Sequence, residues 1–281
     1  MYSRTMADIM EEIGVRKFPD FFSLVKVKHA PMSHQIDMAK RYAKSRRYLD
    51  AGEAGSGKTF PAHLHGLLMA SLGNKVVYVM PPKLIEQFEE ELEDYFLGIR
   101  HFVTMARLNY PAAKKQKMVE EFEEKGWPDI LFLSYDGYRE FNDLNKKKKI
   151  GANQWYAEDG SRWKEGDKPY TKDGRPIDRK GYAENNKHKL LTKRGYNTFF
   201  FDEDHNLCGL DSIISRSVEE SAQGDTAIYL MTGTPVPTTI SDAYGLIRLV
   251  NPEAYASQSA FERQHIKYRS QRIPHPRFKG R

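Results

Sequence analysis

The sequence has few of the features that mark secreted and membrane proteins. Cys208 is the single cysteine in 281 residues, which excludes a disulfide within the chain and fits a reducing compartment. No run of about 18 consecutive apolar residues is present, so the sequence predicts no transmembrane helix. Residues 1–15 carry acidic side chains and lack the apolar segment of a signal peptide. These absences predict an intracellular protein, located in the cytoplasm or with the nucleoid or nucleus, that makes no use of a membrane.

Positive charge is concentrated in one part of the chain. The formal net charge is +6, whereas residues 143–195 alone hold fifteen Lys/Arg and eight Asp/Glu, which leaves the remainder at −1. A local basic excess on a nearly neutral body is typical of a site that binds polyanions. A solvated, lysine-rich loop is the alternative interpretation.

Short apolar runs alternate with amphipathic stretches along most of the chain. Strands are predicted at residues 75–80, 129–134, 198–201 and 227–231, and helices at 63–69, 84–96 and 112–125. Continuous apolar strands separated by helices are typical of a parallel sheet that is covered on both faces. The sequence therefore predicts an α/β fold with helices on both sides of the sheet.

A polar stretch at residues 145–194 interrupts this alternation. It opens with Lys146, Lys147, Lys148 and Lys149. Asp159-Gly160 and Asp173-Gly174 are signals for hairpin turns, and aromatic residues flank both. Because a structureless loop of this length is unusual inside a compact domain, the stretch is predicted to be a small inserted β-meander.

The segment DAGEAGSGKTF, residues 50–60, has the composition of a phosphate-binding loop. Its glycines are Gly52, Gly55 and Gly57. They allow successive backbone N–H groups to converge on an anion, while Lys58 adds a positive charge and Thr59 a hydroxyl for Mg²⁺. A short strand ending at Tyr48-Leu49 precedes the loop and the helix at 63–69 follows it, so the helix N-terminus faces the anion. A glycine-rich turn that matches by chance is the alternative.

A second candidate site follows the predicted strand at 198–201. The segment FFFDEDHN places four polar residues there: Asp202, Glu203, Asp204 and His205. In a parallel sheet this strand end is where ligands bind. Asp202 is the candidate for holding Mg²⁺ and Glu203 for orienting an attacking water. A simple polar turn is the alternative, and Lys58 in the same chain argues against it.

Three further segments complete an ordered set. Ser33-His34-Gln35 precedes the phosphate loop, Pro81-Pro82-Lys83 follows the strand after it, and Thr232-Gly233-Thr234-Pro235 follows the strand after the acidic segment. The set resembles the first motor domain of superfamily 2 DExH-type helicases and translocases, and most closely their Swi/Snf-like branch. The resemblance covers about residues 31–252 outside the insertion and implies a RecA-like P-loop NTPase fold.

The resemblance implies a role for each matching residue. ATP would be bound by Gln35, Gly55, Ser56, Gly57, Lys58 and Thr59, with Gln35 reading adenine. Mg²⁺ would be held by Thr59 and Asp202, and catalysis would use Lys58, Asp202 and Glu203. Nucleic acid would contact Pro82, Lys83, Ser134 and Tyr135, with Lys146, Lys147, Lys148 and Lys149 as further contacts from the insertion. Coupling of the two ligands would involve His205, Thr232, Gly233 and Thr234.

The chain departs from the Swi/Snf-like pattern at two positions. Gly52 stands where that branch has an acidic residue, and Asp204 stands where it has a small one. The second RecA-like domain of the family brings arginines to the ATP site in a Q-x-x-G-R-x-x-R pattern, which is missing from this sequence. We therefore expect a second RecA-like domain beyond Arg281, and weak hydrolysis by this chain alone.

These observations predict three segments of the chain and one main function. Residues 1–30 would form an N-terminal extension, 31–255 the first RecA-like ATPase domain, and 256–281 a linker. The expected function is ATP- and Mg²⁺-dependent translocation or unwinding of nucleic acid, with double-stranded DNA as substrate. A module that binds nucleic acid or a partner protein through the insertion, with ATP as a switch, is one alternative. The other is a P-loop ATPase unrelated to nucleic acid, which the ordered motifs argue against.

Overall fold

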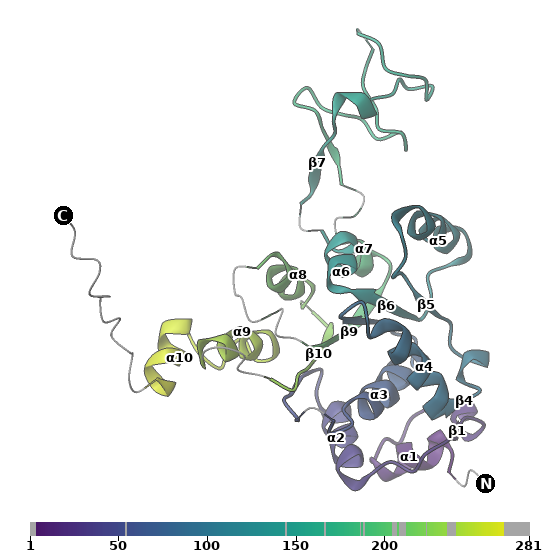
Figure 1. The fold of residues 1–281 in the computed structure, drawn as a ribbon, viewed down its shortest axis with the longest axis vertical. Coiled ribbons are helices and arrows are strands. Elements are labelled where there is room, and N and C mark those ends of the chain that lie inside the picture. Colours follow the sequence, from purple (N-terminus) through teal and green to yellow (C-terminus); the bar gives the residue numbers. More distant parts are fainter. Residues whose placement is uncertain are drawn as a thin grey trace, which may run out of the picture.

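The fold is known from a computed structural model, shown in Figure 1. The described residues are 4–53, 55–143, 145–165, 167–185, 187, 189–203, 207, 212–222, 224–234 and 240–266. Within them, a six-stranded sheet has the order β2-β10-β9-β3-β6-β5, and every pair of neighbouring strands is parallel. The predicted α/β fold with a parallel sheet is confirmed.

The strands of this sheet are β2 (Arg47–Asp50), β3 (Lys75–Met80), β5 (Met105–Arg107), β6 (Ile130–Ser134), β9 (Tyr196–Asp202) and β10 (Ala227–Met231). The four long predicted strands correspond to β3, β6, β9 and β10. Because parallel strands need crossover connections, each strand is joined to the next by a helix-containing segment, and all carboxyl ends lie at one edge of the sheet. We call this the carboxyl edge.

Helices cover both faces of the sheet. The first face carries α1 (Met6–Glu12), α2 (Ser33–Lys44), α3 (Thr59–Ser71) and α4 (Ile85–Tyr95). The second face carries α5 (Ala112–Lys125), α6 (Tyr135–Phe141), α7 (Leu190–Lys193), α8 (Ile213–Ser221) and α9 (Ile240–Val250).

Alternate residues of β3 face opposite cores, as the twofold period of a strand requires. Val76 and Tyr78 pack in the first core, and Val77 and Val79 pack in the second. Full burial of such a side chain contributes roughly 1.5–3 kcal/mol. Since β3 is buried on both faces, its sequence is a continuous apolar run.

Residues 4–30, expected to be an extension, pack against the first face. They include α1, the 3₁₀ turn η1 (Asp20–Ser23) and β1 (Lys26–Val27), which pairs antiparallel with β4 (Phe96–Leu97) ahead of the 3₁₀ turn η2 (Ile99–His101). Met6, Ile9 and Met10 of α1 are fully buried in the same core as α3. This segment therefore shares its core with the sheet.

The chain after the sheet continues in another helix. Residues 256–281, expected to be a linker, include α10 (Gln258–His265). Phe261 of α10 is buried, with its ring 5.7 Å from that of Tyr244 and 5.0 Å from that of Tyr255. Residues 267–281 lie outside the described part of the chain.

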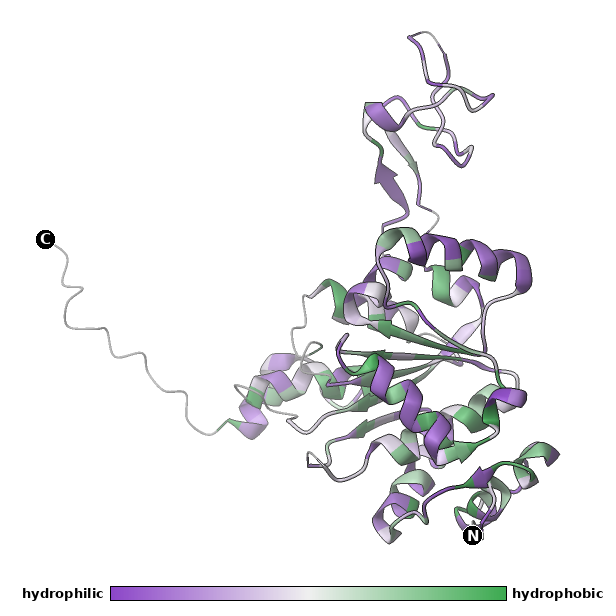
Figure 2. Ribbon diagram, turned by 45° about the vertical axis from the view of Figure 1, so that its right-hand side comes forward, coloured by the Kyte–Doolittle hydropathy of each residue, from purple (hydrophilic) through white to green (hydrophobic). Residues whose placement is uncertain are grey.

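The polar insertion projects from the sheet domain as a separate arm, which we define as residues 146–185 (Figure 1). Its stalk is the antiparallel pair β7 (Lys147–Lys149) and β8 (Tyr182–Glu184), and a 3₁₀ turn, η3 (Ala152–Gln154), follows β7. Figure 2 shows that the arm is largely hydrophilic. The predicted β-rich insertion is confirmed, although α7, which lies within residues 145–194, packs on the body through Leu190 and Leu191.

Three turns of the same construction shape the arm. In each, two backbone hydrogen bonds close a five-residue segment, at 157–161, 171–175 and 178–182. The fourth residue is a glycine in the left-handed region, namely Gly160, Gly174 or Gly181, with φ of +81°, +78° and +81°. This geometry joins antiparallel strands and favours glycine at that position. The turns at the two Asp-Gly pairs were predicted, and the one ending at Gly181 was not.

In the part of the chain that the structure describes, no helix is long and apolar enough to cross a bilayer.

Candidate nucleotide and nucleic-acid sites

The predicted segments meet at the carboxyl edge of the sheet. Asp50, the last residue of β2, pairs with Met231 of β10, which in turn pairs with Asp202 of β9. On the other side of β9, Met80 at the end of β3 pairs with Ser134 at the end of β6. The strand register therefore brings the phosphate loop, the acidic segment, Pro81-Pro82-Lys83 and Thr232-Gly233-Thr234 to one edge.

The phosphate loop has the backbone geometry that its glycines predict. Gly55 and Gly57 have φ of +78° and +75°, in the left-handed region that side chains disfavour. Lys58 is the N-cap residue of α3, and its Nζ donates to the carbonyl oxygens of Gly52 at 2.7 Å and Glu53 at 2.8 Å. The ammonium group thus lies inside the curve of the loop, at the positive end of a 13-residue helix.

Gln35, at the start of α2, forms a hydrogen bond with this loop. Its Nε2 donates to the Gly57 carbonyl oxygen at 3.1 Å, and its Oε1 accepts from the Met32 N–H at 2.9 Å. A Cβ on Gly57 would lie 2.4 Å from Gln35 Nε2, so a side chain at position 57 would displace this contact. His34 Nε2 lies 2.9 Å from the Ser56 carbonyl oxygen. The residue expected to read adenine is therefore bonded to the phosphate loop in this structure.

Asp50 is a site residue that the sequence analysis missed. Its side chain is buried, with Oδ1 accepting from the Gly52 N–H at 3.2 Å and Oδ2 from the Tyr42 hydroxyl at 3.4 Å. Burial raises the pKa of Asp50, while the Gly52 N–H and the Lys58 charge act in the opposite direction. A Cβ on Gly52 would lie 3.2 Å from this carboxylate and 2.9 Å from Ser56 Oγ. The space for a side chain at position 52 is therefore already filled.

The acidic segment contains a carboxyl group, that of Asp202, with a raised pKa. Burial raises the pKa of Asp202 to about 6, with a further contribution from the Glu203 charge, while the Glu203 N–H and Lys58 act in the opposite direction. Glu203 has a φ of +53°, which is rare for a residue with a Cβ. A cation bound beside Asp202 would favour its charged form. Asp204 and His205 lie outside the described residues.

The threonine motif follows β10, which lies between β2, the strand before the phosphate loop, and β9, the strand before the acidic segment. Thr232 is fully buried, its N–H donates to the Asp50 carbonyl oxygen at 2.9 Å, and its Oγ1 accepts from the Thr234 N–H at 3.0 Å. Gly233 is half-buried and Thr234 is exposed. The motif is thus joined directly to the strand that carries the phosphate loop.

The predicted nucleic-acid contacts differ in exposure. Pro82 and Lys83 are exposed and line a cavity of about 280 Å³ together with Arg107 and Asn109. Asn109 Nδ2 donates to the Pro82 carbonyl oxygen at 3.1 Å. Arg107 and Asn109 were not predicted from the sequence. Arg107 ends β5, which is three residues long and has no apolar run that would mark it.

Ser134 and Tyr135 have bonds within the protein. The Ser134 hydroxyl oxygen accepts from the Gly137 N–H at 3.1 Å and caps α6. Tyr135 is 8% exposed, and its hydroxyl donates to the Asp202 carbonyl oxygen at 2.9 Å. Tyr135 therefore connects the end of β6 to the acidic segment, and Ser134 caps the helix that carries it.

The lysine run lies on the stalk of the arm. Lys146, Lys147, Lys148 and Lys149 are all exposed. Lys147 Nζ lies 3.2 Å from Asp178 Oδ2, in the turn at 178–182 that leads into β8. The run is therefore displayed outside the sheet domain (Figure 1).

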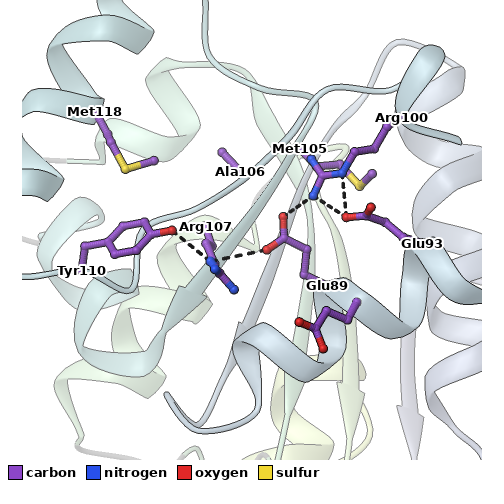
Figure 3. A pocket seen from close by; sticks show the side chains of 9 residues that line it. Glu89, Glu93, Arg100, Met105, Ala106, Arg107, Tyr110 and Met118 are labelled. Atoms are coloured by element: carbon purple, nitrogen blue, oxygen red, sulfur yellow. Dashed lines mark hydrogen bonds and ion pairs between the residues drawn. The ribbon is translucent and has the colours of Figure 1, made fainter.

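A cavity of about 410 Å³ opens at β5, at the opposite end of the sheet from β2 (Figure 3). Arg100 donates to Glu89 and Glu93, each at 2.6 Å, and Arg107 Nε donates to the Tyr110 hydroxyl at 3.0 Å. Both arginines of the cavity thus pair with acidic or phenolic side chains that also line it. We interpret the cavity as the ion-paired border of the sheet, remote from the phosphate loop.

The residues at the carboxyl edge fit ATP with Mg²⁺. Ser56 Oγ is buried and has no hydrogen-bond partner among the described residues, which leaves a donor in the phosphate loop. Lys58 supplies the cation, while the Thr59 hydroxyl at the start of the helix and the Asp202 carboxylate at the end of β9 are the hard oxygen ligands that Mg²⁺ prefers. The arrangement suits a triphosphate at the helix N-terminus and a metal ion between the loop and β9.

Comparisons with known proteins identify the same type of domain. The SNF2-related domain family matches residues 5–273. RNA polymerase-associated proteins RapA from Pseudomonas fluorescens and Pseudomonas syringae pv. tomato are 22% and 23% identical over 250 residues, which cover 86% of this chain and 21% of each relative. The chain thus spans about a fifth of the length of these relatives. The Sulfolobus solfataricus SWI2/SNF2 ATPase core, solved in complex with dsDNA, has a TM-score of 0.51 at 16% identity and covers 84% of this chain and 39% of that one.

Proposed function

Because the chain belongs to the SNF2-related domain family, we propose that it is the first motor domain of an ATP-driven enzyme that moves along double-stranded DNA. A structural neighbour was solved in complex with dsDNA, and curated relatives are RNA polymerase-associated, which supports nucleic acid as the substrate. The proposal includes an intracellular location and a second RecA-like domain that completes the ATP site.

The strand register at the carboxyl edge is the observation that carries this proposal. Asp50, Met231 and Asp202 are aligned on three neighbouring strands, so the loop that starts after Asp50 faces the carboxyl group of Asp202. The charge of Lys58 acts on the pKa of Asp202, which places the two groups in one electrostatic environment. A phosphate loop and a metal-binding carboxylate are the minimum that a P-loop ATPase requires.

The predicted site residues each have a role in this proposal. Bound ATP with Mg²⁺ supplies the phosphoryl group whose transfer to water releases free energy. Lys58 and the loop N–H groups hold the phosphates, and Thr59 with Asp202 holds the metal. Glu203 orients the attacking water. Arginines of the second domain stabilise the transition state, and such residues raise turnover by about 10³–10⁵.

The proposed path of the nucleic acid runs past the exposed ends of β3 and β5. Lys83 supplies positive charge beside the cavity that Pro82 and Asn109 also line, whereas the Arg107 guanidinium there is paired with Glu86 at 2.8 Å. The arm lysines add a second contact, for which a partner protein is the alternative ligand. Contacts of this kind position the protein on the phosphate backbone without reading sequence.

Calorimetric titration with MgATP tests the nucleotide site in this chain. We expect weak binding that Lys58→Ala reduces about 10- to 100-fold, because the mutation removes charged hydrogen bonds to phosphate. Lys125→Ala, on the last turn of α5, is the control and should bind as the wild type does. Equal affinity in Lys58→Ala and wild type would contradict the site assignment.

Turnover in the full-length protein separates a motor from a switch. Glu203→Gln should lower the DNA-stimulated rate about 100-fold or more and leave MgATP affinity intact, because it removes only the group that orients water. Loss of affinity in this variant would assign Glu203 to metal binding or folding. Wild-type turnover no faster than that of Glu203→Gln, with or without DNA, would favour the module that uses ATP as a switch.

A further inference from the structure

The hydroxyl of Tyr135 links two strand ends that are not neighbours in the sheet. Tyr135 follows β6, and the carbonyl oxygen that accepts from its hydroxyl at 2.9 Å belongs to Asp202 at the end of β9. The strand β3 lies between β6 and β9. The side chain therefore reaches past the end of β3 and joins the predicted nucleic-acid segment to the acidic segment.

The accepting carbonyl belongs to the peptide that joins Asp202 to Glu203. Because a peptide is planar, a turn of this carbonyl turns the whole plane, and with it ψ of Asp202 and φ of Glu203. Glu203 has a φ of +53°, a left-handed conformation that costs free energy in a residue with a Cβ. Strained backbone of this kind persists only where surrounding contacts hold it, and it concentrates at functional sites.

We propose that Tyr135 is a positioning residue for hydrolysis: its hydroxyl holds the Asp202–Glu203 peptide in the orientation that directs the Glu203 carboxylate. The inference rests on the proposed function of this site and adds a route for its regulation. Tyr135 is the first residue of α6, directly after Ser134, whose hydroxyl oxygen caps the same helix through the Gly137 N–H. A nucleic acid that displaces Ser134 also displaces the Tyr135 hydroxyl and so changes the direction of Glu203.

The surroundings of Tyr135 favour this role over simple packing. Its ring lies 6.4 Å from that of Phe201, the residue before Asp202, so both its ring and its hydroxyl contact the end of β9. Phenylalanine at position 135 would keep the ring contact and lose the bond to the carbonyl. The bond and the packing can therefore be tested separately.

Tyr138 offers a matched control on the same helix. It is fully buried, and its ring lies 5.3 Å from that of Phe201. Its hydroxyl donates to Ser221 Oγ at 3.2 Å and accepts from Asn142 Nδ2 at 3.0 Å, which are contacts to α8 and to the end of α6. Tyr138→Phe thus removes a buried hydroxyl from the same core without changing the acidic segment.

The experiment compares Tyr135→Phe, Tyr138→Phe and Glu203→Gln in the full-length protein. MgATP affinity, basal turnover, DNA-stimulated turnover and thermal stability are measured for each. We expect Tyr135→Phe to keep its affinity within about 2-fold and to lose about 10- to 100-fold in stimulated turnover, because a small misplacement of a catalytic group has effects of this size. The ratio of stimulated to basal turnover should also fall. Tyr138→Phe should lose stability alone.

Two results would overturn the inference. The first is a Tyr135→Phe enzyme whose turnover and stimulation match the wild type while Glu203→Gln is inactive, since Glu203 would then be positioned without the hydroxyl. The second is an equal loss of turnover in Tyr135→Phe and Tyr138→Phe, which would mean general damage to the core. If Glu203→Gln retains full turnover, the proposed role of Glu203 fails and the positioning role fails with it.

Discussion

Two buried histidines on α3, the helix that follows the phosphate loop, make the stability of the domain depend on pH. His63 and His65 are 0% and 6% exposed, and burial lowers the pKa of each to about 3. The His63 ring lies 4.2 Å from that of Phe88, and His65 Nε2 lies 2.7 Å from the Tyr229 hydroxyl. Both imidazoles are therefore neutral in the folded protein at neutral and mildly acidic pH.

The sign of the effect follows from this shift. In the unfolded chain a histidine takes up a proton below its ordinary pKa of 6.5, whereas these two stay neutral in the fold. Their contribution is therefore fully present above pH 6.5 and is lost as the pH falls. At pH 5 each histidine lowers the free energy of unfolding by about 2 kcal/mol relative to its value well above pH 6.5, and the pair lowers it by about 4 kcal/mol. That is a large part of the roughly 5–15 kcal/mol that stabilises a typical domain.

Unfolding by urea between pH 8 and pH 5 measures this effect. In His63→Leu and in His65→Leu, the loss of unfolding free energy over this range should be about 2 kcal/mol smaller than in the wild type. The readout is the slope of unfolding free energy against pH, compared between variant and wild type. Asp202, with its raised pKa, changes stability in the opposite sense, but it does so equally in all the proteins and cancels in this comparison. His101→Gln, at an exposed position, should keep the wild-type slope. An unchanged slope in both leucine variants would refute the reasoning.

Two further predictions concern the phosphate loop and the arm. Asp50→Ala should weaken MgATP binding about 10-fold by calorimetry, whereas Asp50→Asn, which keeps an acceptor for the loop, should stay within about 3-fold. Tyr42→Phe, which removes the other bond to this carboxylate, should leave the affinity unchanged; an equal loss there would make Asp50 purely structural. Glutamines in place of Lys147–Lys149 should reduce the slope of log affinity against log salt by up to about 3 for duplex DNA. The same change at Lys117 and Lys125 of α5 is the control, and equal slopes in all proteins would argue against a phosphate contact by the arm.

The central strands were predictable from the sequence, and the border of the sheet was not. β3 and β9 are buried on both faces, so their apolar runs are continuous and easily recognised. β5 pairs with one neighbour only, and its three side chains are half-buried, so no apolar pattern marks it. The burial of α1 depends on its contacts with the first core, which a local pattern of residues does not contain.

Residue types predicted much of the candidate site, and tertiary contacts added further candidates. Lys58 and Asp202 were identifiable because phosphate and metal binding demand particular residues at particular places in a strand–loop–helix unit. Asp50 had a weaker signal, an acidic residue two positions before a glycine that replaces the acid of the related motif. The bond from Tyr135 to the Asp202 carbonyl joins residues 67 apart in sequence, and no spacing rule predicts it.

The aromatic residues of the arm indicate which of its groups are available to a ligand. The Trp155 and Trp163 rings pack edge to face with their centroids 5.1 Å apart, and their indole N–H groups donate to backbone carbonyl oxygens within the arm. The Arg162 guanidinium lies over the Tyr156 ring. These contacts form the small core that a meander with three turns needs, so both indoles are already engaged within the arm. The groups left for a polyanion are the exposed cations of the arm, namely the stalk lysines together with Lys164, Lys168, Lys172, Arg179 and Lys180. A ligand held by charge alone is bound without reading its sequence, which suits the proposed motor, since such a motor must move along DNA of any sequence.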